Sequence, residues 1–528
     1  MSWREKTRNY ESVAYFIGLA LMAASLTLSP FMMSVSQFLL LATWLFLGDP
    51  VKTKLQRFVH NKVAVVIVSL YILHVVGLLY TTDFAYALKD LRVKLPLVVF
   101  PLILSSTKPL DQRYTGWLML IYVLSVAVAT GISFSHYLQH DYTDIRKISR
   151  HISHIRFCLN IVLVIGITGY HLFTRRMPWW EHMLCLVLII WFIYQLFIFE
   201  SVSGYATFLG IIVAAMVYWF FSRVKNRKRR ILGIAVILGL PLLVAVLLYR
   251  TIAPMLHAQP VDLATLEKKT AKGHDYWHDT LHFPVEDGQY VGLYLCPMEL
   301  REAWNQRSSL DYDGVTTNGE NLEATLIRYM ASKGLRKDAE GMASLSDQDI
   351  HNVEQGIANY VNWTHPGVYA RLSETVFEYN QYRRYNNPNG GSLSQRLEYT
   401  RASWLLIRKH PVFGVGTGDI PQAYQQAYDE LQSPLEPQYR HKAHNQYLSI
   451  TVGFGVIGLA LFLFVLLYPY LAFQENRTLL YTLFLTILLI SMLPEDTIET
   501  QAGVSFYAFF NSLFIFAFKK RKNNRMTL

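Results

Sequence analysis

The sequence has few charged residues. Asp, Glu, Lys and Arg make up 16% of the 528 residues, whereas soluble domains usually carry about 25%. Hydrophobic residues make up 52% and gather in long runs, which excludes a disordered or a wholly soluble protein. The mean hydropathy is only +0.21, which excludes a chain that lies in a membrane throughout. A large polar part must therefore exist as well.

Cysteine is also scarce, with three residues in the chain. Cys158 and Cys185 lie in apolar runs, and Cys296 stands alone in a polar region. No pair has CxxC or metal-ligand spacing, so the sequence indicates neither a disulfide framework nor a zinc site. We expect no bound metal and no cofactor.

Apolar stretches close to the ~20 residues that a helix needs to cross a bilayer recur along the chain. We expect the first to be an anchor rather than a signal peptide, because it is too long and lacks a cleavage site. Pro96 and Pro101 interrupt one stretch, and a tight hairpin is expected at Ser29-Pro30. The predicted fold class is an all-α polytopic membrane protein with about twelve transmembrane helices. The stretches are 13–29, 31–47, 63–80, 91–105, 114–135, 155–173, 183–199, 203–222, 231–249, 446–470, 478–494 and 502–518.

Basic residues concentrate on one side of this predicted topology. The two chain ends and one alternating set of loops hold 23 of the 49 Lys and Arg residues but only six Asp and Glu residues, and they include the runs 223–230 and 519–522. Because short loops rich in Lys and Arg stay in the cytoplasm, we expect both termini there. The net charge of +11 then reflects topology, and no nucleic-acid partner is expected.

The same topology places residues 250–445 outside, as a large and mainly helical periplasmic insertion between the ninth and tenth helices. We therefore expect three parts: residues 1–249 with nine membrane helices, the periplasmic residues 250–445, and residues 446–528 with three helices and a basic cytoplasmic tail.

Residues 392–428 of the insertion contain the first candidate motif. Ser392 or Ser394 can cap a helix, and the spacing of Leu397, Thr400, Trp404 and Ile407 predicts its buried stripe. Pro411 is expected to end this helix.

Gly414, Gly416 and Gly418 then build a tight loop. This loop could bring backbone N–H groups close to a phosphate or a sugar, or it could simply connect two helices. A GxGxG pattern that follows a helix is not a dinucleotide fingerprint.

The second candidate motif lies where the tenth membrane helix begins. His441, Lys442 and His444 are expected at its outer end, with Asn445 beside them. A neutral imidazole in this place can take a proton from a sugar hydroxyl. Alternatively, these side chains only anchor the helix end in the membrane interface.

Together, the two motifs resemble the signature of the O-antigen ligase superfamily, which includes lipid-linked O-antigen ligases, O-antigen polymerases and some protein O-oligosaccharyltransferases. The stretches that carry the resemblance are RLEYTRASWLLIRKHPVFGVGTGD and AHNQYLSITVGFGVIGL. The first stretch has the Arg and the Pro-x-x-GxGxG loop of the family pattern. The second has its His-Asn-x-x-Leu at the start of a membrane helix. Other family-like segments are TDFAYALKDLRVKLPLVVFPLIL, SRHISHIRF and EDTIETQAGVSFYAFF.

The resemblance implies an inverting, metal-independent glycosyltransferase that uses a polyprenyl-diphosphate-linked glycan at the periplasmic face. It implies functional roles for Arg396 and His444. Thr400 departs from the pattern, because an aromatic residue is usual there, and Val202 replaces the usual Arg of segment 201–208. The motif or structural positions are Trp404, Pro411, Gly414, Gly416 and Asn445.

A diphosphate leaving group is stabilised by cations in a dry site. Lys94, Arg92, Arg156 and Arg401 are the candidates for binding it. Lys94 and Arg156 are expected inside their spans, where an intramembrane cation is a functional candidate, or they snorkel to lipid headgroups. The cations expected near the outer surface are Lys89, Arg92, Lys94, Arg146, Lys147, Arg150 and Arg156. The acids that could orient them, or be ordinary loop residues, are Glu200, Glu495 and Glu499.

The predicted function is transfer of a glycan from undecaprenyl diphosphate to lipid A-core, another glycan or a protein. His444 would be the general base and Arg396 would hold the diphosphate, with membrane lipids as further partners. A polymerase of the same superfamily, a twelve-helix transporter and a non-catalytic relative are the alternatives. The uneven split into nine and three spans argues against a transporter. The sequence does not name the glycan, the acceptor or the oligomeric state.

Overall fold

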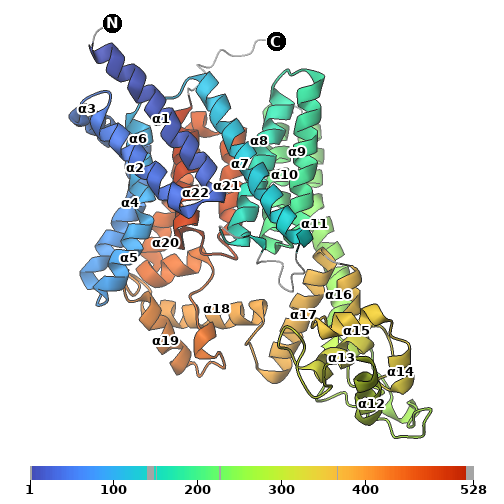
Figure 1. The fold of residues 1–528 in the computed structure, drawn as a ribbon. Coiled ribbons are helices and arrows are strands. Elements are labelled where there is room, and N and C mark those ends of the chain that lie inside the picture. The colour runs from blue at the N-terminus through green and yellow to red at the C-terminus, as the bar shows by residue number, and fades with distance from the viewer. Residues whose placement is uncertain (1–2, 140–147, 150–151, 225–226, 366, 519–528) are drawn as a thin grey trace.

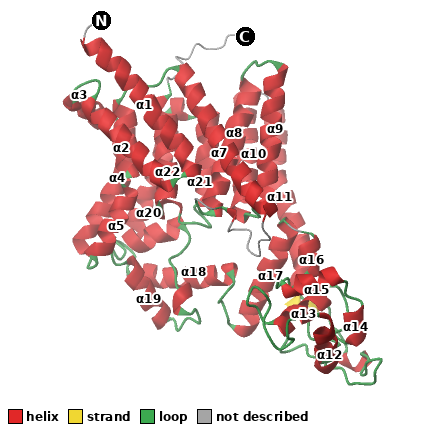
Figure 2. Ribbon diagram, in the orientation of Figure 1, coloured by secondary structure: helices red, strands yellow, loops and turns green. Residues whose placement is uncertain are grey.

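The computed structural model describes the chain except for residues 1–2, 140–147, 150–151, 225–226, 366 and 519–528. Arg146, Lys147, Arg150 and the basic tail therefore lie outside the described residues. The protein is mostly helical (Figure 2). A bundle of long apolar helices forms one part, and the polar insertion lies beyond one end of it (Figure 1).

The first eleven helices build most of the bundle. Ser29 caps α2 through Met32 N, and Pro30 begins that helix, so α1 and α2 form the predicted tight hairpin. The helices are α1 (Trp3–Leu28), α2 (Pro30–Phe46), α3 (Val51–His60), α4 (Lys62–Val76), α5 (Phe84–Lys94), α6 (Pro96–Ser106), α7 (Gln112–Gln139), α8 (His154–Thr174), α9 (Trp179–Ile198), α10 (Val202–Arg223) and α11 (Arg227–Leu256).

Three helices after the insertion complete the bundle, namely α20 (Gln446–Ala472), α21 (Leu479–Ser491) and α22 (Gln501–Ser512), with the short helices η6 (Thr497–Glu499) and η7 (Leu513–Ala517). Residues along α22 and η7 are buried almost throughout. Phe506, Phe509 and Phe510 of α22 pack edge-on against one another in the central core. A helix that is apolar all round belongs inside a bundle, and α22 occupies that place.

Helices occupy each of the twelve ranges predicted to span the membrane. Within the described part of the chain, seven helices are long and apolar enough to cross a bilayer. An eighth span arises if α2 and α3, bent by 110°, count as one. The structure thus confirms a polytopic all-α membrane protein, while the number of crossings stays a prediction. In Figure 1, α1 begins on the side of the bundle opposite to the insertion.

The insertion has two hydrophobic cores. Trp304, Tyr312 and Tyr329 are buried at the centre of one, and Tyr399, Tyr424 and Tyr428 belong to the other, which reaches α20 at Val452. The elements are β1 (Val285–Glu286), β2 (Gln289–Tyr290), α12 (Pro297–Arg307), α13 (Leu322–Ser332), α14 (Ala339–Ala343), α15 (Asp347–Glu354), α16 (Tyr360–Thr364), α17 (Val368–Tyr385), α18 (Ser392–Lys409) and α19 (Ile420–Glu430).

Candidate functional site

Helix α18 lies across the end of the bundle (Figure 1), and it packs through a face that the sequence did not predict. Its buried residues include Glu398, Tyr399, Ala402 and Ser403. The Ser403 hydroxyl is 2.7 Å from the Tyr424 hydroxyl of α19. Trp404, by contrast, is 54% exposed. The predicted stripe of Leu397, Thr400, Trp404 and Ile407 is therefore wrong, because small and polar side chains allow the close packing of α18 on α19.

Arg396 of α18 reaches the turn between α21 and α22. Its guanidinium donates to the Glu495 carboxylate at 2.9 Å. Burial raises the pKa of Glu495 to about 7, against the opposing effect of Arg396. A carboxylate whose pKa lies near neutrality changes its charge easily, so the ion pair with Arg396 is conditional on pH.

His444 lies one residue before the cap of α20, with a left-handed φ of 47°. Its Nδ1 is buried, makes no hydrogen bond with any described residue and lies 3.7 Å from the Asp496 carboxylate. Its ring packs 5.5 Å from that of Tyr399. Burial lowers the pKa of His444, Asp496 opposes this, and the charges of Arg396 and Arg156 lower it further. The imidazole is therefore neutral at pH 7 and able to accept a proton.

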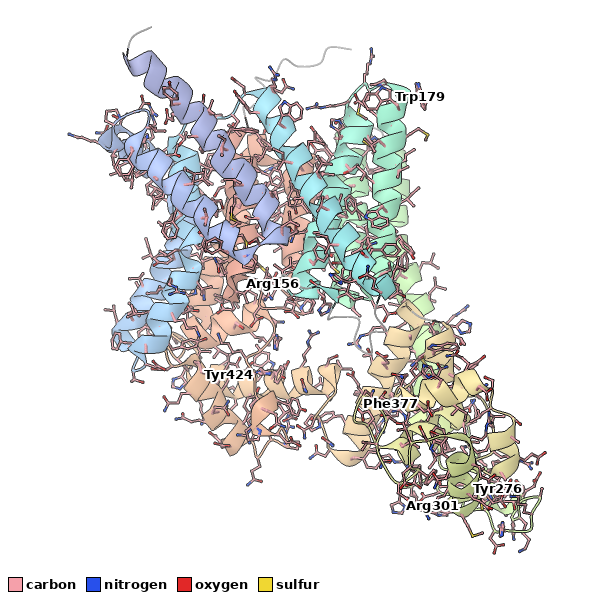
Figure 3. All side chains as sticks on the ribbon, viewed as in Figure 1. Arg156, Trp179, Tyr276, Arg301, Phe377 and Tyr424 are labelled. Carbon is pink, nitrogen blue, oxygen red and sulfur yellow. The ribbon has the colours of Figure 1, made fainter. Side chains whose placement is uncertain are left out.

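Arg156 comes to the same place from α8. Figure 3 shows it at the end of the bundle that faces α18. Its charge lowers the pKa of both Glu495 and His444, and its buried Nε has no hydrogen-bond partner among the described residues. Three distant parts of the chain thus meet in one set of side chains, the arginine–histidine cluster, consisting of Arg156, Arg396, His444, Glu495 and Asp496.

Hydrogen bonds fix two of the segments that carry the cluster, namely the start of α20 and the turn with Glu495 and Asp496. Asn445 caps α20 through Leu448 N, in agreement with its predicted structural role. Gln446 is fully buried, and its backbone N–H donates to the Met492 and Glu495 carbonyls. Its side-chain oxygen accepts from Ile498 N at 2.8 Å. The turn with Glu495 and Asp496 is therefore held next to His444.

Lys94 does not contribute a free cation to the cluster. Its side chain is 1% exposed and contacts Asp90 at 2.6 Å and Glu499 at 3.0 Å. Lys442 lies 3.6 Å from the same Glu499. These four residues form the lysine network, with two charges of each sign. The prediction that Lys94 binds diphosphate is not supported, because its donors already serve two buried carboxylates.

Two other predicted cations also point elsewhere. Arg401 donates to Glu398 at 2.5 Å and contacts Tyr382 of α17, so it lies on the side of α18 that faces α17. Arg92 is exposed and lies two residues before Lys94 on α5, which is about 200° around the helix at 100° per residue. Helical geometry therefore separates Arg92 from the buried face.

The glycine loop binds protein backbone rather than phosphate. Helix α20 is broken at Gly455, whose φ is 63°, and such a break leaves backbone groups without helical partners. The loop supplies them: Val415 N donates to Val452 O, Gly416 N to Gly453 O, and Val456 N donates to Pro411 O. The phosphate interpretation is thus wrong for these amides, and the connecting-loop interpretation is confirmed.

Glycine is required in this loop by close backbone contact. A Cβ on Gly414 would lie 2.3 Å from the carbonyl carbon of Gly453, and one on Gly455 would lie 2.1 Å from that of Val412. No real Cβ contact is that short. The contact joins the first motif to the helix that follows His444 and so brings the two motifs together.

Sequence reasoning underestimated the acids between the last two membrane helices. Glu495 and Glu499 were expected to be ordinary loop residues as readily as partners of the cations, and Asp496 was not considered. Their only signal was a position between two apolar runs, on the side of the membrane where His444 was expected.

Ligand atoms of His444, Glu495 and Asp496 lie within 4.8 Å of one another, as does a second group, His274, Cys296 and Glu299. Beside the first group, Arg396 and Arg156 oppose a divalent cation electrostatically. The arrangement is better suited to an anion.

Comparison with known proteins gives one match. No curated protein matches the chain, but the family model described as O-Antigen ligase matches residues 351–463. The matched segment contains Arg396, the glycine loop, His444 and the first part of α20. Residues 351–463 are therefore similar to the O-antigen ligase family, and this match supports the assignment of the chain to the O-antigen ligase superfamily.

Proposed function

We propose that this protein is a membrane glycosyltransferase that transfers a glycan from a polyprenyl diphosphate carrier to an acceptor hydroxyl. The observation that carries the proposal is the convergence of Arg156, Arg396 and His444 at one end of the bundle. A base and two cations in one site match the two needs of the reaction, which are deprotonation of the acceptor and stabilisation of a departing diphosphate.

In the proposed reaction the acceptor oxygen attacks the anomeric carbon of the lipid-linked glycan. The new carbon–oxygen bond forms as the bond to the diphosphate oxygen breaks, with inversion at that carbon. His444 takes the acceptor proton, because its buried imidazole is neutral at pH 7. Asp496 stabilises the imidazolium that results, at a distance of 3.7 Å in the resting protein.

Arg396 and Arg156 are the proposed diphosphate ligands. Arg396 is paired with Glu495 in the resting site, but the raised pKa of Glu495 allows that carboxylate to take up a proton. An arriving diphosphate favours this protonation, since negative charge nearby raises the pKa of an acid further. Arg396 then exchanges its carboxylate partner for a phosphate oxygen.

The location of the site follows from the charge pattern. The chain ends and loops on the side opposite the insertion carry a large excess of basic over acidic residues, and the positive-inside rule assigns such a side to the cytoplasm. We therefore propose that both termini are cytoplasmic and that the site faces the periplasm of a bacterial inner membrane. Undecaprenyl diphosphate is the proposed carrier, and lipid A-core, another glycan or a protein the proposed acceptor.

A transfer assay tests the proposal. Purified protein is incubated with an undecaprenyl-diphosphate-linked glycan and a candidate acceptor, and the product is identified by mass. His444→Ala is expected to lower kcat by about 10²–10⁴-fold, the usual contribution of a general base. Arg396→Ala is expected to lower transfer as well, by loss of a charge-assisted contact to the diphosphate.

Arg401→Ala is the matched control. Arg401 lies on the same helix and is also ion-paired, but it faces away from the cluster, so full activity is expected. Correctly folded His444→Ala and Arg396→Ala variants with full activity would refute the site. A product that grows by repeat units would identify a polymerase instead of a ligase.

A further inference from the structure

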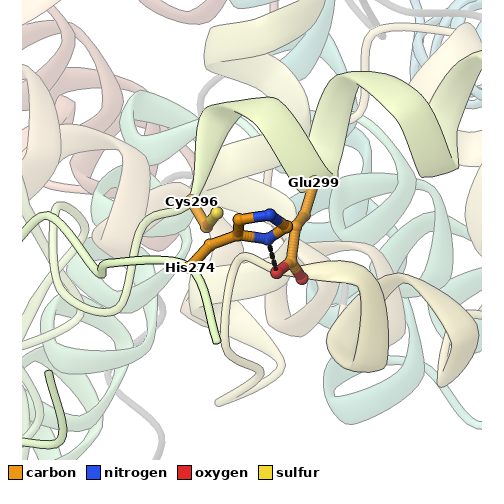
Figure 4. Close-up of side chains that lie close together, drawn as sticks. All are labelled: His274, Cys296 and Glu299. Atoms are coloured by element: carbon orange, nitrogen blue, oxygen red, sulfur yellow. Dashed lines mark hydrogen bonds and ion pairs between the residues drawn. The ribbon is translucent and has the colours of Figure 1, made fainter. Parts of the chain in front are cut away.

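A second group of side chains meets in the insertion, at the start of α12. Figure 4 shows His274, Cys296 and Glu299 with their side chains turned toward one another. Each offers one metal-ligand atom, and these atoms lie within 4.8 Å of one another. We call this group the His274 cluster. It lies at the far end of the insertion from the bundle, where Figure 1 places α12.

The start of α12 holds two of the three residues. Cys296 is the residue before the helix, Pro297 begins it, and Glu299 is in its first turn. Burial raises the pKa of the Cys296 thiol, and the backbone amide of Glu299 acts in the opposite direction. A sulfur at a helix N-terminus lies where N–H groups and the helix dipole favour the thiolate.

His274 is oriented by Glu299. Its Nδ1 lies 2.7 Å from the Glu299 carboxylate, so these two ligand atoms face the same space. A metal ion between them would replace this hydrogen bond and take both atoms as ligands. The His274 side chain is 42% exposed, whereas Cys296 is buried, so an ion can enter from the side of the histidine.

Glu299 already connects three segments of the insertion. Besides His274, it accepts from the Thr270 hydroxyl at 2.6 Å and from Ala339 N at 3.0 Å. Cys158, Cys185 and Cys296 are all free, so no disulfide reinforces this contact. A metal bound here would cross-link His274 to Cys296 and Glu299 at the start of α12.

We propose that His274, Cys296 and Glu299 form a zinc site of the insertion, with three protein ligands. Thiolate and imidazole ligands select zinc over magnesium or calcium, and a water molecule completes the four-coordinate shell. Zinc–ligand bonds of about 2.0–2.3 Å place the ligand atoms roughly 3.3–3.7 Å apart. His274 Nδ1 and the Glu299 oxygen, now 2.7 Å apart, therefore separate slightly when the ion binds. Binding releases the thiol proton to solvent, so affinity falls as the pH falls.

Cobalt substitution tests the site in the full-length protein. The protein is purified in detergent, stripped with a chelator and titrated with Co²⁺. We expect one ion per chain with a thiolate-to-cobalt charge-transfer band in the near ultraviolet, displaced by an equimolar amount of Zn²⁺. The band reports sulfur ligation, so binding at His444, Glu495 and Asp496 would not produce it.

Two variants and a control make the result specific. Cys296→Ala is expected to abolish the band, and His274→Ala to weaken binding at least tenfold. His282→Ala is the control, because His282 lies on the same segment but outside the cluster and is 82% exposed. Zn²⁺ is expected to raise the unfolding temperature of wild type and His282→Ala, and not that of Cys296→Ala.

A titration without the band, or a band that survives Cys296→Ala, would overturn the zinc site. Neither outcome affects the glycosyltransferase proposal, which rests on other residues and is measured by transfer.

Discussion

Replacement of Lys94 with methionine tests whether this lysine supports the fold of the site or binds the substrate. Its buried ammonium contacts Asp90 and Glu499 at 2.6 Å and 3.0 Å. Methionine has a similar length but no charge. Lys442 would then be the one cation left in the network for the Asp90 and Glu499 carboxylates. Removal of one partner from a buried ion pair costs about 3–5 kcal/mol. We expect Lys94→Met to lower the free energy of unfolding by this amount, because the Lys94 side chain has almost no access to water.

The assay is thermal unfolding of the purified protein in detergent, alongside the transfer reaction. Lys94→Met is expected to lower the unfolding temperature and, by loosening the turn that holds Asp496 beside His444, to lower kcat. Lys89→Met, an exposed change on the same helix, is expected to leave both unchanged. The double variant Lys94→Met/Glu499→Met keeps one charge of each sign in the network and is expected to recover most of the lost stability.

One result would refute this reasoning. If Lys94→Met unfolds at the wild-type temperature, while KM for the lipid-linked donor rises and kcat stays constant, Lys94 binds the donor directly. The double variant would then show no recovery.

Three further predictions follow from the site. Burial raises the pKa of Glu495 from 4.5 to about 7. At a pH above about 7 the ionised carboxylate holds Arg396, so the KM for the donor should increase there. Glu495→Gln should abolish this increase. For the same reason Glu495 favours folding less as the pH rises from 4.5 through 7, which the pH dependence of unfolding will show. Burial opposes ionisation of Glu499, but Lys94 and Lys442 hold its pKa well below 4.5, so wild type should lose stability below pH 4.5. Gly414→Ala should cost about 2–5 kcal/mol from backbone strain and overpacking, whereas Gly116→Ala, with no atom within 4 Å of its Cβ, should be neutral in thermal unfolding.

The buried face of α18 was not predicted correctly from the spacing of its apolar residues. The spacing of apolar residues on α18 indicated a stripe through Trp404, yet the buried face carries Glu398, Ala402 and Ser403. Periodicity assumes that a helix packs with apolar side chains. Here α19 approaches so closely that small and hydrogen-bonded side chains are needed, and this approach is set by the whole fold.

The cations illustrate the same limit. Lys94, Arg156 and Arg401 look equivalent in the sequence, as basic residues expected near one membrane surface. In the structure Lys94 pairs with Asp90 and Glu499, and Arg401 pairs with Glu398. The buried Nε of Arg156, by contrast, has no hydrogen-bond partner among the described residues. Which cation is available depends on where the acids lie, and those acids are distant along the chain.

The sequence by itself determined the class of the protein and its two motifs. Long apolar runs need a membrane because water cannot solvate them, and the motif residues are local in the chain, so both can be read from composition and spacing. Only the tertiary structure decided that the glycine loop fills the break in α20, that Glu495 and Asp496 join His444, and that Cys296 meets His274. Each of these is a contact between segments far apart in sequence, fixed by packing and by the requirement that buried backbone and charged groups find partners.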